Sequence, residues 1–259
     1  MSKPLFLAAA PPENLPVPPR VLQAARGEAV HGVWLNALGG VTYRLGEGPA
    51  QRFAKWSPYT ASANGAGRGA ADELDLRLEA ERLRWAADYL AVPRVLSLEE
   101  FDDGQLMVTA ALPGQNLVSD VGKAEPKLAA RALGRGLRRL HEALPVERCP
   151  FRWDVATRAG WLAGELRERF LTEAPEEDLV VCHGDACAPN TLVGPGYEVT
   201  GHVDFGELGV GDRWADLAVA AWSTEWNFGA GVQSEVYAGY GIEPDERKID
   251  FYRRLWDAT

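Results

Sequence analysis

Two short segments in the C-terminal half of the chain combine residue types that handle metal ions and protons. The first is His-Gly-Asp-Ala-Cys-Ala-Pro-Asn at residues 183–190, and the second is Asp-Phe-Gly at residues 204–206. Asp185 can accept the proton of a hydroxyl group, whereas Asn190 and Asp204 offer the hard oxygen ligands that Mg²⁺ prefers. Phosphoryl transfer needs this combination, because the protein's task in that reaction is to position groups and to stabilise charge.

The order and spacing of these residues make the signal specific. His-x-Asp-x-x-x-x-Asn followed by Asp-Phe-Gly is the kinase pattern, although Gly184 stands where that pattern has Arg. Taken singly, His183 could be a core histidine, Asp185 a turn residue and Asp204 a strand-end cap. The presence of both segments in the right order favours the catalytic interpretation.

The residues around the two segments predict the local structure that positions them. Apolar runs occupy residues 179–182, 191–193 and 199–203, and Gly-Pro-Gly at 194–196 is a strong turn signal. This pattern is typical of a strand, a turn and a second strand. We therefore expect a hairpin with the carboxylates at its mouth.

A lysine in the N-terminal half lies in an unusual place for a charge. Lys55 is near the end of an apolar strand predicted at residues 52–56, where a buried ammonium needs a partner. The next predicted helix covers residues 72–90, and Glu79 lies on the same face as its leucine stripe. A strand lysine that contacts nucleotide phosphates and pairs with a helix glutamate accounts for both residues. The alternative for Glu79 is a solvated helix charge.

Alternating segments separated by glycines predict an antiparallel sheet in the N-terminal half. A proline-rich, extended lead-in over residues 1–20 comes first. Strands are expected on both sides of a tight loop at 36–40, and then at 52–56, 94–98 and 105–112. The loop could cover nucleotide phosphates, but the full glycine-rich pattern is absent and an ordinary hairpin is the default. The C-terminal half is instead mainly helical, with helices predicted at 127–143, 158–171 and 215–224.

Composition narrows the class of protein. The chain has 37 acidic against 27 basic residues and a formal net charge of −10. This balance disfavours nucleic-acid binding and favours a polycationic small molecule, although acidity for solubility alone is an equal alternative. Three cysteines without a Cys-x-x-Cys pair argue against disulfides or structural zinc and suit a reducing cytoplasm. No apolar run approaches the length of a membrane span.

The sequence also resembles a known family. Val-Val-Cys-His-Gly-Asp-Ala-Cys-x-Pro-Asn at residues 180–190, with Leu-Gly-Val-Gly-Asp-Arg-Trp-Ala-Asp-Leu-Ala at 208–218, closely resembles the aminoglycoside phosphotransferases. The resemblance extends from about residue 32 to the C-terminus and is densest over 178–221. It implies an α+β fold of the two-lobed protein-kinase type. The N-terminal lobe, residues 1–112, would contain a five-stranded antiparallel sheet and one helix, and residues 113–259 would form a mainly helical C-terminal lobe.

The resemblance assigns roles to individual residues. The cofactors would be Mg²⁺ and ATP, with GTP as an alternative nucleotide. Asp185 would be the catalytic base, Asn190 and Asp204 would bind magnesium, and Lys55 with Glu79 would hold the phosphates. Backbone groups of Ala110 and Leu112 would bond the adenine. Asp216 would steady the catalytic loop, unless it forms a surface ion pair with Arg213, and we interpret His141 as structural.

The chain departs from the family on the acceptor side. The segment 151–178 is shorter than the acidic helical insert of the 3′-kinases, and Glu207 replaces an arginine. Where the family has an Arg-Asp pair and a glutamate, this chain has Trp222, Ser223 and Trp226, with Glu225 adjacent. Asp257 is the remaining acid of a C-terminal pair. Candidate acceptor-binding residues are Glu225, Trp226 and Asp257, and Trp222, Trp226 and Trp256 could form an aromatic pocket or belong to the core.

These observations leave three functions to compare. We expect a cytoplasmic kinase, monomeric or dimeric, that phosphorylates a cationic aminoglycoside. The alternative is a kinase of the same fold that acts on another antibiotic, a sugar or a choline-like metabolite. A regulatory pseudokinase would have lost at least one of four residues, all of which are present: Lys55, Asp185, Asn190 and Asp204.

Overall fold

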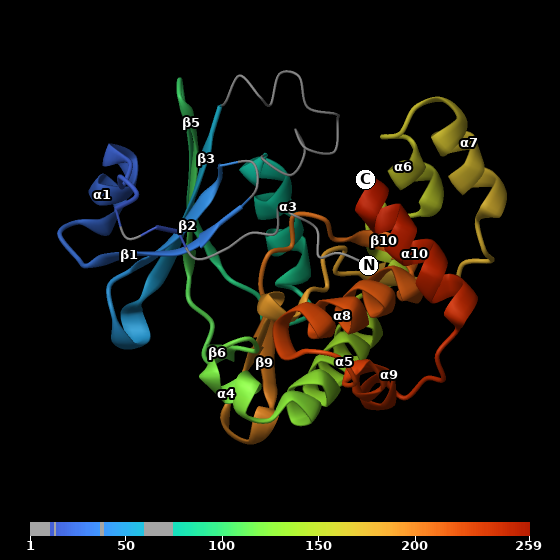
Figure 1. The fold of residues 1–259 in the computed structure, drawn as a ribbon. Helices are drawn as coiled ribbons and strands as arrows, with labels where there is room; N and C mark the ends of the chain where they lie inside the picture. Colours follow the sequence, from blue (N-terminus) through green and yellow to red (C-terminus); the bar gives the residue numbers. More distant parts are fainter. Residues whose placement is uncertain (1–10, 13, 37–38, 60–74) are drawn as a thin grey trace. The chain divides into compact units, whose positions relative to one another are not determined.

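The computed structural model describes residues 11–12, 14–36, 39–59 and 75–259 of the chain. The chain divides into two compact units. The first comprises Met1–Trp85 and Pro93–Ala111, and the second Ala86–Val92 and Leu112–Thr259. Figure 1 shows the course of the chain through both units. Among the helices within the described ranges, none has the length and apolar character needed to cross a bilayer.

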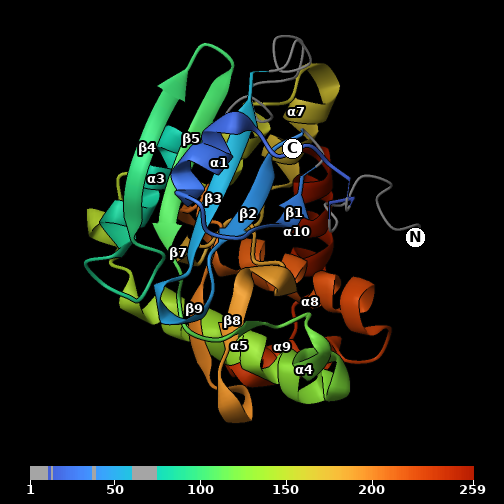
Figure 2. The same cartoon turned by 90° about the vertical axis from the view of Figure 1, so that its left-hand side faces the viewer.

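The first unit is built on an antiparallel sheet of five strands, as the sequence predicts. The spatial order is β1-β2-β3-β5-β4, and every neighbouring pair is antiparallel. Figure 2 shows the sheet with its strands side by side. The strands are β1 Val30–Leu35, β2 Val41–Leu45, β3 Arg52–Pro58, β4 Val95–Phe101 and β5 Gly104–Ala110. Part of the predicted loop at 36–40 lies outside the described residues.

One face of this sheet is covered by a short helix that the sequence analysis did not predict. Helix α1, Pro19–Ala25, packs its buried Val21 and Ala25 into the same apolar cluster as Ala54 and Trp56 of β3. The expectation of an extended lead-in up to residue 20 is therefore wrong at its end. The prolines that suggested an extended chain are compatible with a helix start, because proline is tolerated in the first turn.

The helix that carries Glu79 is shorter than predicted. Helix α3, Leu76–Ala86, ends four residues before the expected Leu90, and residues 72–74 lie outside the described ranges. The amides of Tyr89 and Leu90 instead turn back to the carbonyl of Ala86. Pro93 then disfavours helical backbone at the residue before it. The predicted stripe nevertheless holds where the helix exists, because Leu76, Glu79 and Leu83 are all buried.

The second unit contains two small sheets that hold the functional loops. Strand β7, Leu179–Cys182, pairs antiparallel with β10, Gly209–Asp212. The other sheet has the order β6-β8-β9, with β6 Gln115–Asn116, β8 Thr191–Val193 and β9 Val199–His202. The β8–β9 pair is the predicted hairpin. Strand β10 was not predicted, because Gly-Val-Gly-Asp shows no alternation of apolar and polar residues.

Helices make up most of the second unit, as expected. Figure 1 shows α5, α8, α9 and α10 gathered around its core. Helices α5 and α9 approach closely at two glycines: a side chain at Gly134 would overlap the backbone of Val236, and one at Gly239 would overlap that of Arg131. The helices are α4 Asp120–Ala124, α5 Pro126–Ala143, α6 Val155–Ala159, α7 Gly164–Glu173, α8 Arg213–Phe228, α9 Gln233–Tyr240 and α10 Glu246–Ala258.

The single helix predicted at 158–171 is wrong. The chain forms α6 and α7 instead, and the segment between them makes turns and then leaves the helical conformation at Ala163. Ala163 is extended, and Gly164 has a φ of +58°. A left-handed glycine at the start of α7 interrupts the periodic pattern, and the sequence analysis did not recognise it as a break.

Candidate active site

The loop that contains the first motif is tied at both ends to a sheet. It follows β7 and ends in a single 3₁₀ turn, Ala188–Asn190, which leads directly into β8. Because β7 pairs with β10, and β10 begins shortly after the Asp-Phe-Gly segment, both motifs are anchored to one two-stranded sheet. A second link joins them, since the amide of Val203 donates to the carbonyl of Asn190 at 2.9 Å.

Gly184 explains why the kinase arginine is absent at the second position of the motif. Its φ is +88°, a conformation that residues with a side chain rarely adopt. A Cβ atom there would also overlap the backbone carbonyl of Glu207. The loop therefore packs against the segment after Asp-Phe-Gly so closely that only glycine is accommodated.

The carboxyl group of Asp185 has one oxygen held and one oxygen available. The side-chain amide of Asn190 donates to Oδ2 and to the backbone carbonyl of Asp185, both at 2.9 Å. Oδ1 is buried and, apart from the weakly polar thiol of Cys187, has no donor among the described residues. Burial raises the pKa of Asp185 above its ordinary value, and the negative charge of Asp204 raises it further. Oδ1 can thus accept the proton of an entering hydroxyl group.

Asp204 has an unusual backbone conformation. Its φ is 67°, and it is one of three described residues other than glycine with a positive φ. Such a conformation costs free energy and is maintained only where the surroundings enforce it, which is common at ligand sites. The negative charge of Asp204 acts on Asp185, so the two carboxylates influence each other electrostatically. With its amide nitrogen committed to Asp185, Asn190 has its amide oxygen as the atom that could bind a cation.

Asp216, from helix α8, fixes the start of the loop that contains the first motif. Its carboxylate accepts hydrogen bonds from the amide of His183 at 2.6 Å and from the amide of Gly184 at 2.9 Å. It also bonds Nε2 of His141 at 2.9 Å. Burial alone would raise the pKa of Asp216, but these hydrogen bonds and the neighbouring His141 and His183 lower it below its ordinary value. The alternative of a surface ion pair with Arg213 is wrong, because Asp216 is fully buried.

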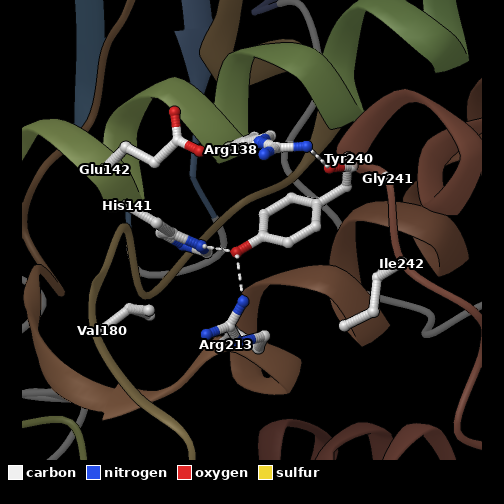
Figure 3. Close-up of a pocket in the computed structure, with 8 residues that line it drawn as sticks. All are labelled: Arg138, His141, Glu142, Val180, Arg213, Tyr240, Gly241 and Ile242. Atoms are coloured by element: carbon white, nitrogen blue, oxygen red, sulfur yellow. Dashed lines mark hydrogen bonds and ion pairs between the residues drawn. The ribbon is translucent and has the colours of Figure 1, made fainter.

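Behind His141, the hydrogen-bond chain continues to a polar cavity of about 230 Å³. Nδ1 of His141 bonds the hydroxyl of Tyr240 at 2.9 Å, and Arg213 donates to the same hydroxyl at 3.3 Å. Figure 3 shows the tyrosine hydroxyl directed toward both His141 and Arg213. His141 thus supports Asp216, in agreement with its interpretation as structural. The cavity is lined by Arg138, His141, Glu142, Val180, Arg213, Tyr240, Gly241 and Ile242.

Arg158 contacts the segment that follows Asp-Phe-Gly, and the sequence analysis missed this residue. Its guanidinium, buried in helix α6, donates to the carboxylate of Glu207 and to the hydroxyl of Thr259. It lies 3.9 Å from the ring centroid of Trp161 and 4.9 Å from that of Trp153. Glu207, which replaces the family's arginine, therefore has its charge balanced by an arginine from elsewhere in the chain. No local pattern could have predicted this contact, because the two residues are far apart in sequence.

In the first unit, Lys55 and Glu79 form the expected ion pair. Nζ of Lys55 lies 2.9 Å from Oε1 and 2.7 Å from Oε2 of Glu79. The reason lies in strand alternation: Ala54 and Trp56 pack on the α1 side of the sheet, so Lys55 extends from the opposite face toward α3. The lysine side chain keeps 24% of its surface exposed, whereas the glutamate keeps 7%. The ammonium is therefore held in place by the carboxylate, on a side chain that is only partly buried.

The remaining predicted residues are those expected to contact the nucleotide base or the acceptor. Ala110 is the last residue of β5, and its amide donates to the carbonyl of Arg94 at 2.9 Å. Leu112 begins the main segment of the second unit. Glu225 and Trp226 are partly exposed on α8, and Asp257 is exposed near the end of α10. Their proposed contacts with nucleotide or acceptor stay predictions.

Comparison with known proteins places this chain in a family. Residues 67–252 match the phosphotransferase enzyme family. The chain belongs to this family. Aminoglycoside 3′-phosphotransferase of Streptomyces fradiae is 35% identical over 87% of this chain and 93% of its own. Streptomycin 3″-kinase of Streptomyces griseus is 34% identical over 87% of this chain and 92% of its own.

Solved structures agree with this membership. A crystal structure of an aminoglycoside 3′-phosphotransferase of type VIII matches with a TM-score of 0.72 and 32% identity, covering 92% of this chain and 96% of that one. An aminoglycoside phosphotransferase of Streptomyces rimosus, in complex with ADP and streptomycin, matches with a TM-score of 0.65 and 27% identity over 90% and 94% of the two chains. The predicted family and the α+β, kinase-like fold class are confirmed.

Proposed function

We propose that this phosphotransferase transfers the γ-phosphoryl group of ATP, in the presence of Mg²⁺, to a hydroxyl group of an aminoglycoside and thereby confers resistance in the cytoplasm. The observation that carries the proposal is the buried Oδ1 of Asp185, an acceptor for which the described residues supply no N–H or O–H donor. A hydroxyl group of the acceptor would supply that donor. The relatives include an aminoglycoside 3′-phosphotransferase and a streptomycin 3″-kinase. Together with the net charge of −10, they favour a cationic amino sugar as the acceptor.

The residues present suit a magnesium ion. Asn190 and Asp204 would hold it through oxygen atoms, and it would supply charge neutralisation on the phosphates. Asn190 also keeps Oδ2 of Asp185 in place, so that the other carboxylate oxygen can take up the hydroxyl proton. Lys55, oriented by Glu79, would neutralise phosphate charge, with ATP or GTP as the nucleotide. Backbone groups of Ala110 and Leu112 would bond the base.

Substitution of the proposed base tests this function. Purified wild type and Asp185→Asn are incubated with ATP, Mg²⁺ and a panel of aminoglycosides, and the products are examined by mass spectrometry for one added phosphate. Loss of a general base should lower kcat by about 100- to 10,000-fold, while the Kd for ATP stays within a few-fold. Asp250→Asn, at an exposed position on α10, is the matched control. Turnover of Asp185→Asn at the wild-type rate would remove Asp185 from the mechanism.

A second candidate is a kinase of the same fold that acts on a small molecule other than an aminoglycoside. Three observations favour it: the charge of Glu207 is already balanced by Arg158, the insert before the catalytic loop is short, and α8 presents tryptophans where the family has charged residues. A wider panel with other antibiotics, sugars and choline-like amines, followed by ATP consumption, separates the two. Binding of ATP without transfer to any acceptor would instead indicate a regulatory protein.

A further inference from the structure

Tyr240 lies between the polar cavity and the residues that support the loop of the first motif. It is the last residue of α9, and 5% of its surface is exposed. Its hydroxyl bonds Nδ1 of His141 at 2.9 Å and accepts a bond from Arg213 at 3.3 Å (Figure 3). Buried polar groups in folded proteins are almost always hydrogen-bonded, so each proton in this set needs a partner.

The chemistry of the neighbours fixes where each proton lies. The carboxylate of Asp216 only accepts, so Nε2 of His141, at 2.9 Å, carries a proton and donates it. Arginine only donates, so the hydroxyl of Tyr240 accepts from Arg213 and has its own proton left to give. The acceptor within its reach among the described residues is Nδ1 of His141. His141 is therefore a neutral imidazole that is protonated at Nε2.

These bonds form one chain in which every donor faces the same way. The chain runs from Arg213 through Tyr240 and His141 to Asp216. The carboxylate at its end also accepts from the two backbone amides that precede Asp185. Hydrogen bonds in such a chain polarise and strengthen one another. A group at the cavity end of the chain can therefore influence the loop at the other end.

The ring of His141 depends on both of its hydrogen bonds. Its side chain is 2% exposed, and Tyr240 and Asp216 each bond one of its nitrogens. The rings of His141 and Tyr240 also meet edge to face, with centroids 5.5 Å apart. With Asp216 alone, the ring could turn about a single bond, and Nδ1 would be a buried acceptor without a donor, which is unfavourable.

We infer that Tyr240 is a positioning residue for phosphoryl transfer. Its hydroxyl orients His141, which holds Asp216 and through it the loop that carries Asp185. Tyr240 acts through His141 and not by contact with the nucleotide or the acceptor. The inference rests on the proposed function, and it assigns a role to a residue of α9, a helix that the sequence analysis did not connect with the site.

The hydroxyl of Tyr240 can be separated from the packing of its helix. Helix α9 approaches α5 closely at Gly134 and Gly239, where an added side chain would overlap backbone atoms. This contact does not involve the tyrosine hydroxyl. Because Tyr240→Phe also keeps the aromatic ring, the variant removes the hydrogen bond and leaves the packing in place.

The matched control is a second buried tyrosine hydroxyl. Tyr252→Phe removes a hydroxyl that has no hydrogen-bond partner among the described residues. We expect Tyr240→Phe to lower kcat about three- to tenfold, the size of one neutral hydrogen bond, with KM for ATP and for the acceptor within about twofold. The amides of His183 and Gly184 should exchange faster, and the ¹⁵N signal of Nδ1 of His141 should move toward that of a nitrogen without a donor. Tyr252→Phe should change none of these.

A double-mutant cycle tests whether Tyr240 acts through the histidine. The amide nitrogen of His141→Gln can still donate to Asp216, but the side chain has no acceptor at the position of Nδ1. In this background Tyr240→Phe should lower kcat by less than about twofold, because two residues that act through one contact are not additive. A further three- to tenfold loss, of about the size expected for the single variant, would mean that Tyr240 acts by another route and would overturn the inference.

The remaining outcomes also decide the question. The inference fails if Tyr240→Phe has the kcat and amide exchange of the wild type, or if Tyr252→Phe loses as much activity. If His141→Gln is unfolded, kcat and the nitrogen signal of Tyr240→Phe decide alone. A wild type that transfers phosphate to no acceptor overturns the proposed function, and amide exchange then still shows whether Tyr240 holds the loop.

Discussion

Asp216 offers the sharpest test of how the fold holds its catalytic loop. Asp216→Asn keeps the size of the side chain, but it removes the charge from a fully buried group that accepts bonds from two backbone amides and from His141. An amide can serve only part of this set, because its nitrogen would face an N–H donor. Breaking a buried charged interaction on one side costs about 3–5 kcal/mol, compared with a total stability of about 5–15 kcal/mol for a typical domain.

The assay measures the free energy of unfolding together with hydrogen exchange at individual backbone amides. Urea unfolding followed by tryptophan fluorescence should show a loss of about 3–5 kcal/mol for Asp216→Asn. Hydrogen exchange should show faster exchange at the amides of His183 and Gly184, because both lose their acceptor. Under conditions where the variant is folded, kcat should fall by a larger factor than the KM of either substrate changes. The reason is that the loop that carries Asp185 is no longer fixed.

The matched control is a change at an exposed carboxylate. Asp250→Asn removes an exposed carboxylate of α10 that pairs with Arg254 at 2.9 Å, and such surface pairs contribute less than about 1 kcal/mol. If Asp216→Asn were as stable as this control and the exchange of the two amides were unchanged, the hydrogen bonds of Asp216 would not hold the loop, and the reasoning would be wrong.

Three further predictions follow from single contacts. Lys55→Met should lower kcat/KM for ATP by about 10- to 100-fold, the equivalent of one lost charged hydrogen bond, and steady-state kinetics would contradict this if only acceptor KM changed. Gly184→Ala should lower kcat at least about tenfold, because its Cβ atom would overlap a backbone carbonyl at a positive φ; wild-type kcat would refute the packing. Burial raises the pKa of the thiols of Cys182 and Cys187, so iodoacetamide at pH 8 should label Cys149 first, as read by peptide mass spectrometry, and equal labelling would contradict this.

The parts of the site that the sequence predicted correctly are those with a local or periodic signal. The hairpin around the two motifs follows from apolar runs and a Gly-Pro-Gly turn. The pairing of Lys55 with Glu79 follows from the alternation of β3 and the stripe of α3, and the structure forms it at 2.7 Å. Both depend on spacing within one element or between two consecutive elements.

The parts that were missed depend on packing between distant segments. Arg158 meets Glu207 only because α6 and the segment after Asp204 pack together, and neither neighbourhood contains a sign of the other. The boundary between α6 and α7 was missed for a different reason. The apolar spacing continues across a glycine whose backbone conformation, rather than its side chain, ends the helix pattern.

The two sides of helix α8 have different structural roles. Asp216 and Ser223 are seven residues apart and therefore on one side, where they hold the loop of the first motif. Trp222 and Trp226 are partly exposed on the outward side. Substitutions on the outward side leave those hydrogen bonds untouched. Sequence drift on the outward side of α8 can therefore proceed without loss of the bonds that hold the loop of the first motif.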